Sequence, residues 1–575
     1  MSRLIKLLCL FLCFLMLAGC GSPALPQETT GLTETVQPTE EVTQPIQTEP
    51  VLDNEILTLA APEHTDFRIV YAYGAAEEIQ DAAKYLQREI QRLTGVELTV
   101  TEDMAYNPKE EAWEILIGST DRGEDDLTYS ELAYTGDYLI CVKGRKFTIA
   151  ANLTESLTAA VLELCEVLSE YTQDGKLVIP ADFRMEGTGA DNAAAMLPAF
   201  TGGSLLATCD GGNGTVLVIY RADSEDCEQY LQKLESLPYT LNASSEIDGN
   251  RYYTYIGNDT TITVMDNPGL GTVRIAVDPE VNTFAAEAEP FEPVVTPSVT
   301  MLGLENYTVS GALNQNGLSL MYQLSDGSFI VVDGGHNTST AARQIYAKMA
   351  ELAPDPTNIV IAAWIITHSH NDHAGAFMRF TQSYAPAVKL EKLLINFTNG
   401  TQCRAGGTGT TYITGVMDCS TFYPDLDIIK VHPGQIFYLR DAEIRVLYTM
   451  DLFEPATLTD FNDSSVVCTV SLGGQKLMQT GDCGVVASGL LVNLYDEALK
   501  CDILQVSHHG YTGGTEELYR AVDPAYVLWP SGSDTFNRYK DATNNRWLLN
   551  ESNMRKLWVA RAEIHTLMLP VTDET

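Results

Sequence analysis

Four side chains that can bind metal ions fall within six consecutive residues of this chain: His368, His370, Asp372 and His373. The whole protein has only nine histidines, so this density is not expected of scattered surface residues. One pair of imidazoles can converge on one ion, and the adjacent aspartate and histidine can reach a second. Neutral imidazole and carboxylate suit zinc, and manganese or iron fit the same donors. The segment therefore predicts a site for two divalent metal ions.

The cluster directly follows a predicted strand and leads into a predicted helix. Residues 361–367 (IAAWIIT) form a continuous apolar run, which is typical of a strand covered on both faces. Ahead of it, the sequence predicts strands over 319–324 and 328–333 and a helix over 340–352. The second of these strands ends in Asp333. We therefore expect strand ends to carry the metal-binding side chains.

Three later segments complete a recognisable order of motifs. They are residues 462–465 (Asn-Asp-Ser-Ser), 480–482 (Thr-Gly-Asp) and 507–510 (Ser-His-His-Gly), each placed at a predicted strand end or turn. Together with the first cluster, this order resembles the metallo-β-lactamase superfamily, and within it the metallohydrolase domain of bacterial ComEC-type DNA-uptake proteins. The resemblance covers residues 300–573 and implies an αββα metallo-β-lactamase fold for them.

The resemblance also implies a role for each residue of the first cluster. His368 and His370 would hold one metal ion, and Asp372 and His373 the other. Asp482 would bridge both ions, because a shared carboxylate offsets the repulsion between two nearby cations. Asp372 would in addition orient the attacking hydroxide, which makes it a catalytic candidate as well as a ligand.

The last ligand is one of two adjacent histidines. His509 is favoured, since a histidine followed by glycine matches the late ligand of the superfamily. His508 then becomes the catalytic candidate that contacts the substrate or donates a proton to the leaving group. The opposite assignment of the two residues stays open.

The sequence departs from the wider superfamily between the first cluster and Asp482. Many members supply a third histidine to the first metal there, and this interval offers only His432, which we interpret as structural. Asn462 occupies the segment instead, so the first metal would have a more open coordination. Asp333 is expected to orient a ligand histidine from behind, unless it only forms a turn before Gly334.

The N-terminal residues predict export and lipid anchoring. Arg3 and Lys6 precede an apolar run over 7–17 that is too short to span a bilayer, which is typical of a signal peptide over residues 1–20. The run ends in Leu-Ala-Gly-Cys, which resembles the bacterial lipobox and implies a lipid on Cys20. Residues 21–54 are rich in Pro, Thr, Gln and Glu and predict a disordered tether. We expect an extracytoplasmic protein anchored to the bacterial cell membrane.

Two small α+β domains are predicted between the tether and the metal-binding domain. Residues 55–187 alternate strands and helices and resemble the N-terminal domain of some secreted glycosidases. Residues 195–285 predict one helix followed by successive hairpins. Residues 284–299, which are acidic and contain three prolines, predict a linker. The whole chain is therefore expected to be an α+β multidomain protein.

Composition narrows the choice of partners. A formal charge of −42 argues against a nonspecific nucleic-acid surface, because phosphate binding needs clustered Lys and Arg. The nine cysteines after Cys20 are an odd number without CxxC spacing, and free buried thiols are expected. Cys209 and Cys227 are the pair to test for a disulfide. No sequence feature identifies a protein partner.

The predicted reaction is metal-assisted hydrolysis, and the bond is left open. A phosphodiester in a small molecule or a cell-envelope polymer is favoured by the resemblance of the His-His-Gly turn. The alternatives are a carboxylic ester, lactone or amide, which the same site can hydrolyse, and a binding lipoprotein with a relic metal site. Intact ligands in every motif argue against the last of these.

Overall fold

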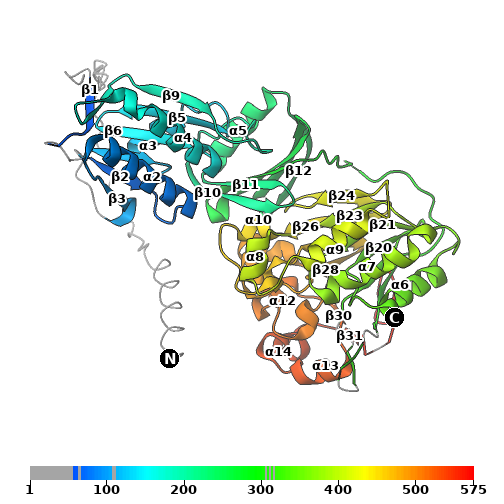
Figure 1. Cartoon of the computed structure of the whole chain (residues 1–575). Helices are drawn as coiled ribbons and strands as arrows, with labels where there is room; N and C mark the ends of the chain where they lie inside the picture. Colours follow the sequence, from blue (N-terminus) through cyan, green and yellow to red (C-terminus); the bar gives the residue numbers. More distant parts are fainter. Residues whose placement is uncertain are drawn as a thin grey trace, which may run out of the picture. The chain divides into compact units, whose positions relative to one another are not determined.

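The computed structural model describes residues 56–574, apart from 63–66, 106–111, 286, 305–306, 310–311, 315–316 and 562 (Figure 1). The predicted signal peptide, Cys20 and the tether lie outside the described residues. No helix in the described part of the chain is both long and apolar enough to cross a membrane.

The first α+β region is built on a mixed sheet in the order β3-β2-β4-β6-β5-β9. Its strands are β2 (Arg68–Tyr71), β3 (Thr99–Glu102), β4 (Glu114–Ile117), β5 (Asp137–Lys143), β6 (Lys146–Ala151) and β9 (Arg184–Thr188). Its helices are α2 (Glu77–Thr94), α3 (Gly123–Tyr129) and α4 (Thr154–Val167), and a small sheet adds β1 (Ile56–Ala60), β7 (Thr172–Gln173) and β8 (Lys176–Pro180). Strands β2, β3, β4 and β6 are parallel, so their carboxyl ends share one edge.

Amphipathic spacing explains how the two long helices cover this sheet. Leu86 and Ile90 lie one turn apart on α2 and are buried against the strands, and Leu157 and Val161 do the same on α4. The sequence predicts α2, α4 and the strands from β2 to β6, whereas β1, α3 and the strands from β7 to β9 were not predicted.

The second region is a six-stranded antiparallel sheet with one helix, in the order β10-β11-β15-β14-β13-β12. Its elements are β10 (Ser204–Gly212), β11 (Thr215–Arg221), α5 (Ser224–Glu235), β12 (Thr240–Ile247), β13 (Asn250–Gly257), β14 (Thr260–Asn267) and β15 (Thr272–Asp278). Asn258 and Asp259 form the turn between β13 and β14, both with positive φ, as the Asn-Asp pair predicts. Strands β10 and β12 were not predicted.

The C-terminal region contains two sheets. The first has the order β24-β23-β21-β20-β19-β16-β32, with β22 paired to β21, and the second runs in order from β25 to β31. The first sheet comprises β16 (Ser298–Met301), β19 (Leu320–Gln323), β20 (Phe329–Val332), β21 (Ile359–Ile366), β22 (Val388–Leu390), β23 (Lys392–Ile395), β24 (Asp427–Lys430) and β32 (His565–Met568). The second comprises β25 (Ile436–Leu439), β26 (Ala442–Tyr448), β27 (Val467–Leu472), β28 (Gln475–Gln479), β29 (Ile503–Gln505), β30 (Tyr526–Trp529) and β31 (Lys556–Val559). The helices are α6 (Ser339–Leu352), α7 (Asn371–Tyr384), α8 (Gly400–Ala405), α9 (Thr411–Ser420), α10 (Met450–Phe453), α11 (Val485–Tyr495), α12 (Glu516–Val522), α13 (Ser533–Tyr539) and α14 (Thr543–Asn550), and a separate hairpin joins β17 (Tyr307–Val309) to β18 (Ala312–Asn314).

Alternating side chains hold these two sheets face to face. On β20, Ile330 and Val332 belong to the apolar cluster between the sheets, while Phe329 and Val331 belong to the cluster under the helices. Strands of the second sheet alternate in the same way. Helices therefore cover the outer face of each sheet, with α6 and α7 beside the strands of the first (Figure 1). This is the predicted αββα arrangement.

The first and last strands of this region were missed by the sequence interpretation. Strand β16 pairs with β19 on one side and with β32 on the other, so the two ends of the domain lie side by side. The predicted linker over 284–299 is therefore too long, because Ser298 and Val299 belong to β16 and are buried. A four-residue strand preceded by three prolines carries too little periodicity to be recognised.

Candidate metal centre

The first cluster lies where β21 ends and α7 begins. His368 and Ser369 form the loop, His370 is the N-cap residue of α7, and Asp372 and His373 lie in its first turn. The helix turn projects His373 back towards the loop, where its ring centroid lies 4.2 Å from that of His368. The Nε2 atom of His368 lies 3.0 Å from Nδ1 of His370. The sequence spacing therefore brings the three imidazoles together.

Asp333 lies behind His373, fully buried at the end of β20. Its carboxylate accepts hydrogen bonds from the Nδ1–H of His373 at 2.8 Å and from the backbone N–H and the hydroxyl of Thr367, both at 2.8 Å. The first bond fixes the ring and directs Nε2 towards the site, where a metal ion could displace its proton. Asp333 has φ 57°, a strained conformation that this bonding network stabilises.

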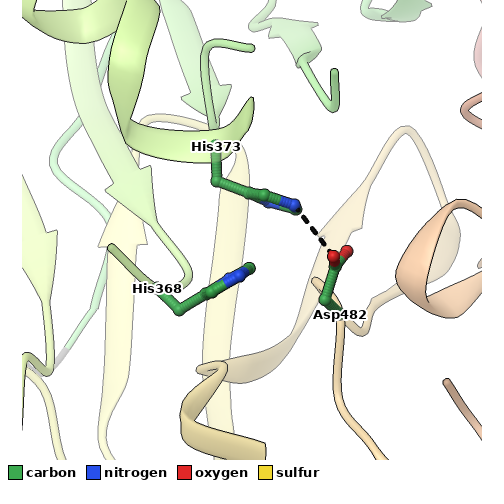
Figure 2. Close-up of side chains that lie close together, drawn as sticks. All are labelled: His368, His373 and Asp482. Atoms are coloured by element: carbon green, nitrogen blue, oxygen red, sulfur yellow. Dashed lines mark ion pairs between the residues drawn. The ribbon is translucent and has the colours of Figure 1, made fainter. Parts of the chain in front are cut away.

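Asp482 reaches the cluster from the second sheet. It follows β28 through Gly481, whose φ is 52°, and a Cβ on that glycine would lie 2.8 Å from the Cβ of Thr367. Glycine therefore allows the two strand ends to approach. Asp482 is 2 % exposed, and its Oδ2 lies 3.1 Å from Nε2 of His373. Figure 2 shows the rings of His368 and His373 directed towards this carboxylate.

The Ser-His-His-Gly turn after β29 separates the two adjacent histidines. The Nε2 atom of His509 lies 3.2 Å from Nε2 of His373 and 3.4 Å from Oδ2 of Asp372. Its Nδ1–H donates to the carbonyl of Pro530 at 3.0 Å, so Nε2 again faces the site. The ring of His508 is less buried, and its Nε2 lies 3.9 Å from Asp482. The geometry therefore favours His509 over His508 as the ligand.

The turn keeps this arrangement because the chain is tightly packed around it. Both histidines have positive φ, near 50°. A Cβ on Gly510 would lie 2.1 Å from the ring of Trp529, and the Trp529 indole N–H donates to the carbonyl of His509 at 2.9 Å. A glycine after the histidine pair is therefore a steric requirement here.

Two donor sets of metal-binding size share His373. Ligand atoms of His368, His373 and Asp482 lie within 4.8 Å of one another, and so do those of Asp372, His373 and His509. His370 adjoins the first set through His368. The residues fit a divalent ion, because an N and O donor set suits zinc and because the second carboxylate oxygen of Asp482 is buried without a partner among the described residues. All six predicted ligands are thus brought together.

Burial keeps two of the imidazoles neutral. It lowers the pKa of His368 well below the usual range and lowers that of His370 as well. A neutral imidazole keeps the lone pair that a metal ion needs. The loop therefore presents two ligands that do not have to lose a proton.

At Asp482, His373 and His509, attraction between opposite charges outweighs the effect of burial on the pKa values. Burial disfavours the charged form of Asp482, but His373 and His509 hold the pKa of its carboxyl well below the usual range. In turn, Asp482 and the other carboxylates raise the pKa of both histidines against the effect of burial. Without metal, protons on these rings offset the buried negative charge. A divalent ion would take over that role and release the protons.

The place of the third histidine is taken by polar groups. The hydroxyl of Ser465 lies 3.3 Å from Nδ1 of His368 and accepts the backbone N–H of Asp482 at 3.1 Å. The side-chain nitrogen of Asn462 lies 3.4 Å from Nε2 of His508, and its Oδ1 is buried without a described partner. Asn462 therefore adjoins His508 rather than the ring of His368. The sequence places Ser465 in the Asn-Asp-Ser-Ser motif but gives it no role.

His336 is a further neighbour of the site that sequence reasoning missed. It lies three residues after Asp333 and is 7 % exposed. Burial, together with His509 and His373, lowers its pKa to about 4, while Asp372 acts in the opposite direction. Its ring therefore interacts electrostatically with residues of the second donor set. The available signal was its position in the same strand-end loop as Asp333.

His432 lies elsewhere, as the structural interpretation requires. It follows β24 and is fully buried between two carboxylates, with Nε2 2.8 Å from Asp278 and Nδ1 2.8 Å from Asp451. Asp278 belongs to β15 of the second region and Asp451 to α10. All nine described cysteines, including Cys209 and Cys227, are free.

Comparisons with known proteins concern the domain that carries this site. The family model of the metallo-beta-lactamase superfamily matches residues 315–530. ComE operon protein 3 of Bacillus subtilis strain 168, a ComEC-type protein, is 30% identical over 113 residues, which cover 20% of this chain and 14% of that protein. The C-terminal domain thus belongs to the metallo-beta-lactamase superfamily of metal-dependent hydrolases.

Solved structures add only distant likenesses. The metallo-beta-lactamase fold protein YhfI from Bacillus subtilis is 12% identical and matches 47% of this chain and 100% of its own, with a TM-score of 0.30. CmlA, a diiron beta-hydroxylase from Streptomyces venezuelae, is 11% identical and matches 49% of this chain and 55% of its own, also with a TM-score of 0.30. At these scores the likenesses carry no weight beyond the family match.

Proposed function

We propose that this protein is a lipid-anchored, extracytoplasmic hydrolase that uses two divalent ions, zinc in the first instance, to cleave a phosphodiester in a small or cell-envelope substrate. The observation that carries the proposal is the convergence of six nitrogen and oxygen donors from three separated segments of the chain. Lipid attachment at Cys20 and the location rest on the N-terminal sequence alone.

Each residue of the site would have a distinct task. His368, His370 and Asp482 would hold one ion, and Asp372, His373, His509 and Asp482 the other. When bound, such ions supply Lewis acidity and acidify water so that hydroxide is available near neutral pH. Asp372 would accept a hydrogen bond from the attacking water and orient it. Asp333 would keep the His373 ring in place through its bond to Nδ1.

His508 is the candidate for proton donation to the leaving group. It is more exposed than His509, and it lies at the edge of the donor sets, beside Asn462. A side chain in that position can reach a substrate without binding metal, as general acid catalysis requires. Tyr511 packs on its ring at 5.4 Å between centroids and restricts its orientation.

The bond class is tested by three model substrates on the metal-loaded protein. We expect turnover of bis-p-nitrophenyl phosphate to exceed that of p-nitrophenyl acetate and nitrocefin by at least about tenfold in kcat/KM, which is about 1.4 kcal/mol in transition-state free energy. Preference for the acetate or nitrocefin would replace the phosphodiesterase proposal with an ester, lactone or amide hydrolase. Stoichiometric metal with no turnover of any ester would favour a binding protein.

A further inference from the structure

Asp463 is a buried carboxylate of the Asn-Asp-Ser-Ser motif that belongs to neither donor set. It lies in the short helix η5 (Phe461–Ser464), is 3 % exposed, and its backbone carbonyl accepts the hydroxyl of Tyr448 at 2.7 Å. Its side chain faces the start of α11, where Oδ1 accepts the backbone N–H of Ala487 at 2.9 Å. A carboxylate is costly to bury, so its position here calls for a physical reason.

Helix α11 has no cap of its own. Its N-cap residue is Gly484, which has no side chain to accept the first backbone N–H groups of the helix. Burial raises the pKa of Asp463, while hydrogen bonds from the backbone N–H groups of Ala487, Gly484 and Val486 act in the opposite direction. Asp463 therefore caps α11 from a separate segment, and the positive end of the helix dipole faces its charge.

The carboxylate and the helix start fit closely together. A Cβ on Gly484 would lie 2.7 Å from Oδ1 and 2.9 Å from Oδ2 of Asp463. The φ of Gly484 is −90°, which does not require glycine, so this position needs a small residue for space and not for conformation. A Cβ on Gly489, further along the same helix, would meet open space.

This cap lies just after the carboxylate that would bridge the two metal ions. Asp482 and Cys483 form the loop between β28 and Gly484. Two serines of the sequence motifs also hold this loop: Ser465 accepts the N–H of Asp482 at 3.1 Å, and Ser507 donates to the carbonyl of Cys483 at 2.7 Å. The loop is thus held at its start, middle and end by side chains from two other motifs.

We propose that Asp463 is a positioning residue for Asp482, which it keeps at the metal centre by capping α11 and so fixing the end of the loop. The proposal rests on the two-metal function and gives a reason for a carboxylate within the Asn-Asp-Ser-Ser motif. A bridging ligand must lie within bonding distance of both ions. A small displacement of its loop would therefore weaken its contacts with both.

Asp463→Asn tests the proposal by chelator competition for zinc and by the visible absorption of the cobalt-loaded protein. The amide keeps the shape of the carboxylate, but one oxygen becomes an NH₂ donor that cannot accept from the helix start. We expect zinc affinity to fall about tenfold or more and the cobalt absorption bands to shift, because Asp482 is displaced. A cap that served stability alone would leave the bands of the folded protein unchanged.

Gly484→Ala displaces the same carboxylate without removing it. The added Cβ would overlap Oδ1 of Asp463, so we expect the same loss of zinc affinity and the same change in the cobalt bands. Each variant has a matched control. Asp223→Asn makes the same exchange at the N-cap of α5, and Gly489→Ala adds a methyl group to α11 where there is room. Both controls should bind zinc as the parent does.

Hydrogen–deuterium exchange of the zinc-free protein examines the loop without the metal. A peptide covering residues 482–488 should exchange faster in Asp463→Asn and in Gly484→Ala than in the parent, because the amides at the helix start lose their acceptor. A peptide covering residues 224–235 of α5 should be unchanged in both variants.

Zinc affinity and cobalt bands equal to those of the parent in both Asp463→Asn and Gly484→Ala would overturn the proposal. An equal loss in the two controls would overturn it as well. Because Gly484→Ala keeps the capping carboxylate, its result decides if Asp463→Asn does not fold. A parent that binds no zinc would contradict the two-metal function itself, whereas a zinc-binding parent with unaltered variants contradicts the role of Asp463 alone.

Discussion

At the scale of single residues, the shared position of His373 is the feature with the most consequences. Its Nδ1–H is held by Asp333, and its Nε2 faces Asp482 and His509 at 3.1 and 3.2 Å. It therefore belongs to both donor sets. The ring could serve only one ion through Nε2, so Asp482 rather than His373 would be the group shared by two ions.

Removing a ligand should remove both metal and activity. We expect His370→Ala and Asp482→Ala to lose bound metal and to lower kcat/KM for the best substrate by at least about 10³-fold, about 4 kcal/mol, while the far-ultraviolet circular dichroism stays unchanged. His565→Ala is the matched control, because His565 lies on β32 and its ring nitrogen contacts the carbonyl of Val559 at 2.9 Å. Retained activity in either ligand variant would contradict the site assignment.

Asp333→Asn tests the orienting role of the residue behind His373. The amide keeps the shape of the carboxylate but no longer favours a proton on Nδ1 of His373 as strongly. We expect metal affinity to fall about 10- to 100-fold, as measured by competition with a chromophoric chelator. Asp355→Asn, in an exposed loop, makes the same change far from the site and should have no effect. An unaltered affinity in Asp333→Asn would show that Asp333 only forms the turn.

At the scale of elements, the site was predictable where several residues shared one motif. The apolar run predicts strand β21, and the metal-binding cluster lies directly after this strand, as expected from the sequence. His336 could not be recognised, because a single histidine has no spacing that marks a function, and the Asn-Asp-Ser-Ser motif located Ser465 without showing which residue it contacts. Their proximity arises only when the two sheets are packed together. Strands β16 and β32 were missed for a similar reason, since their pairing is set by tertiary contacts.

The buried contact of Arg274 with the segment around α10 should contribute measurably to the free energy of unfolding. Arg274 of β15 is 6 % exposed and donates to the carbonyls of Asp451 and Glu454 at 2.8 and 2.6 Å. Arg274→Met would leave both carbonyls buried without these donors, so we expect a loss of about 3 kcal/mol in the free energy of unfolding, measured with urea. Arg184→Met removes an exposed ion pair with Glu131 and should cost less than about 1 kcal/mol. Equal costs would contradict this account.

At the scale of the whole molecule, the second region is joined to the catalytic domain by a buried interface. Leu217, Ile219 and Met265 of its sheet belong to the same apolar cluster as the catalytic helices. Polar groups cross the interface as well, including the hydroxyls of Tyr252 and Tyr495 at 2.6 Å. The second region is therefore expected to unfold together with the catalytic domain.

His432 makes this interface sensitive to alkaline pH. Burial alone would lower its pKa, but Asp278 and Asp451 raise the pKa to about 10. The folded pKa exceeds the unfolded value near 6.5, so the charged form stabilises the fold fully below about pH 6.5, and this contribution is lost as pH rises towards 10. We compare the free energy of unfolding of the parent with that of His432→Gln. The advantage of the parent should decline over this window by at most about 1.4 kcal/mol per pH unit. A constant difference from pH 6 to pH 10 would contradict a charged His432.

The most direct measurement of the central claim is anomalous X-ray diffraction from crystals of the zinc-loaded protein. The account predicts two peaks per chain, one beside His368, His370 and Asp482 and the other beside Asp372, His373 and His509, both absent in crystals of Asp482→Ala. Zinc bound only elsewhere on the acidic surface, or no peak within bonding distance of these side chains, would contradict it.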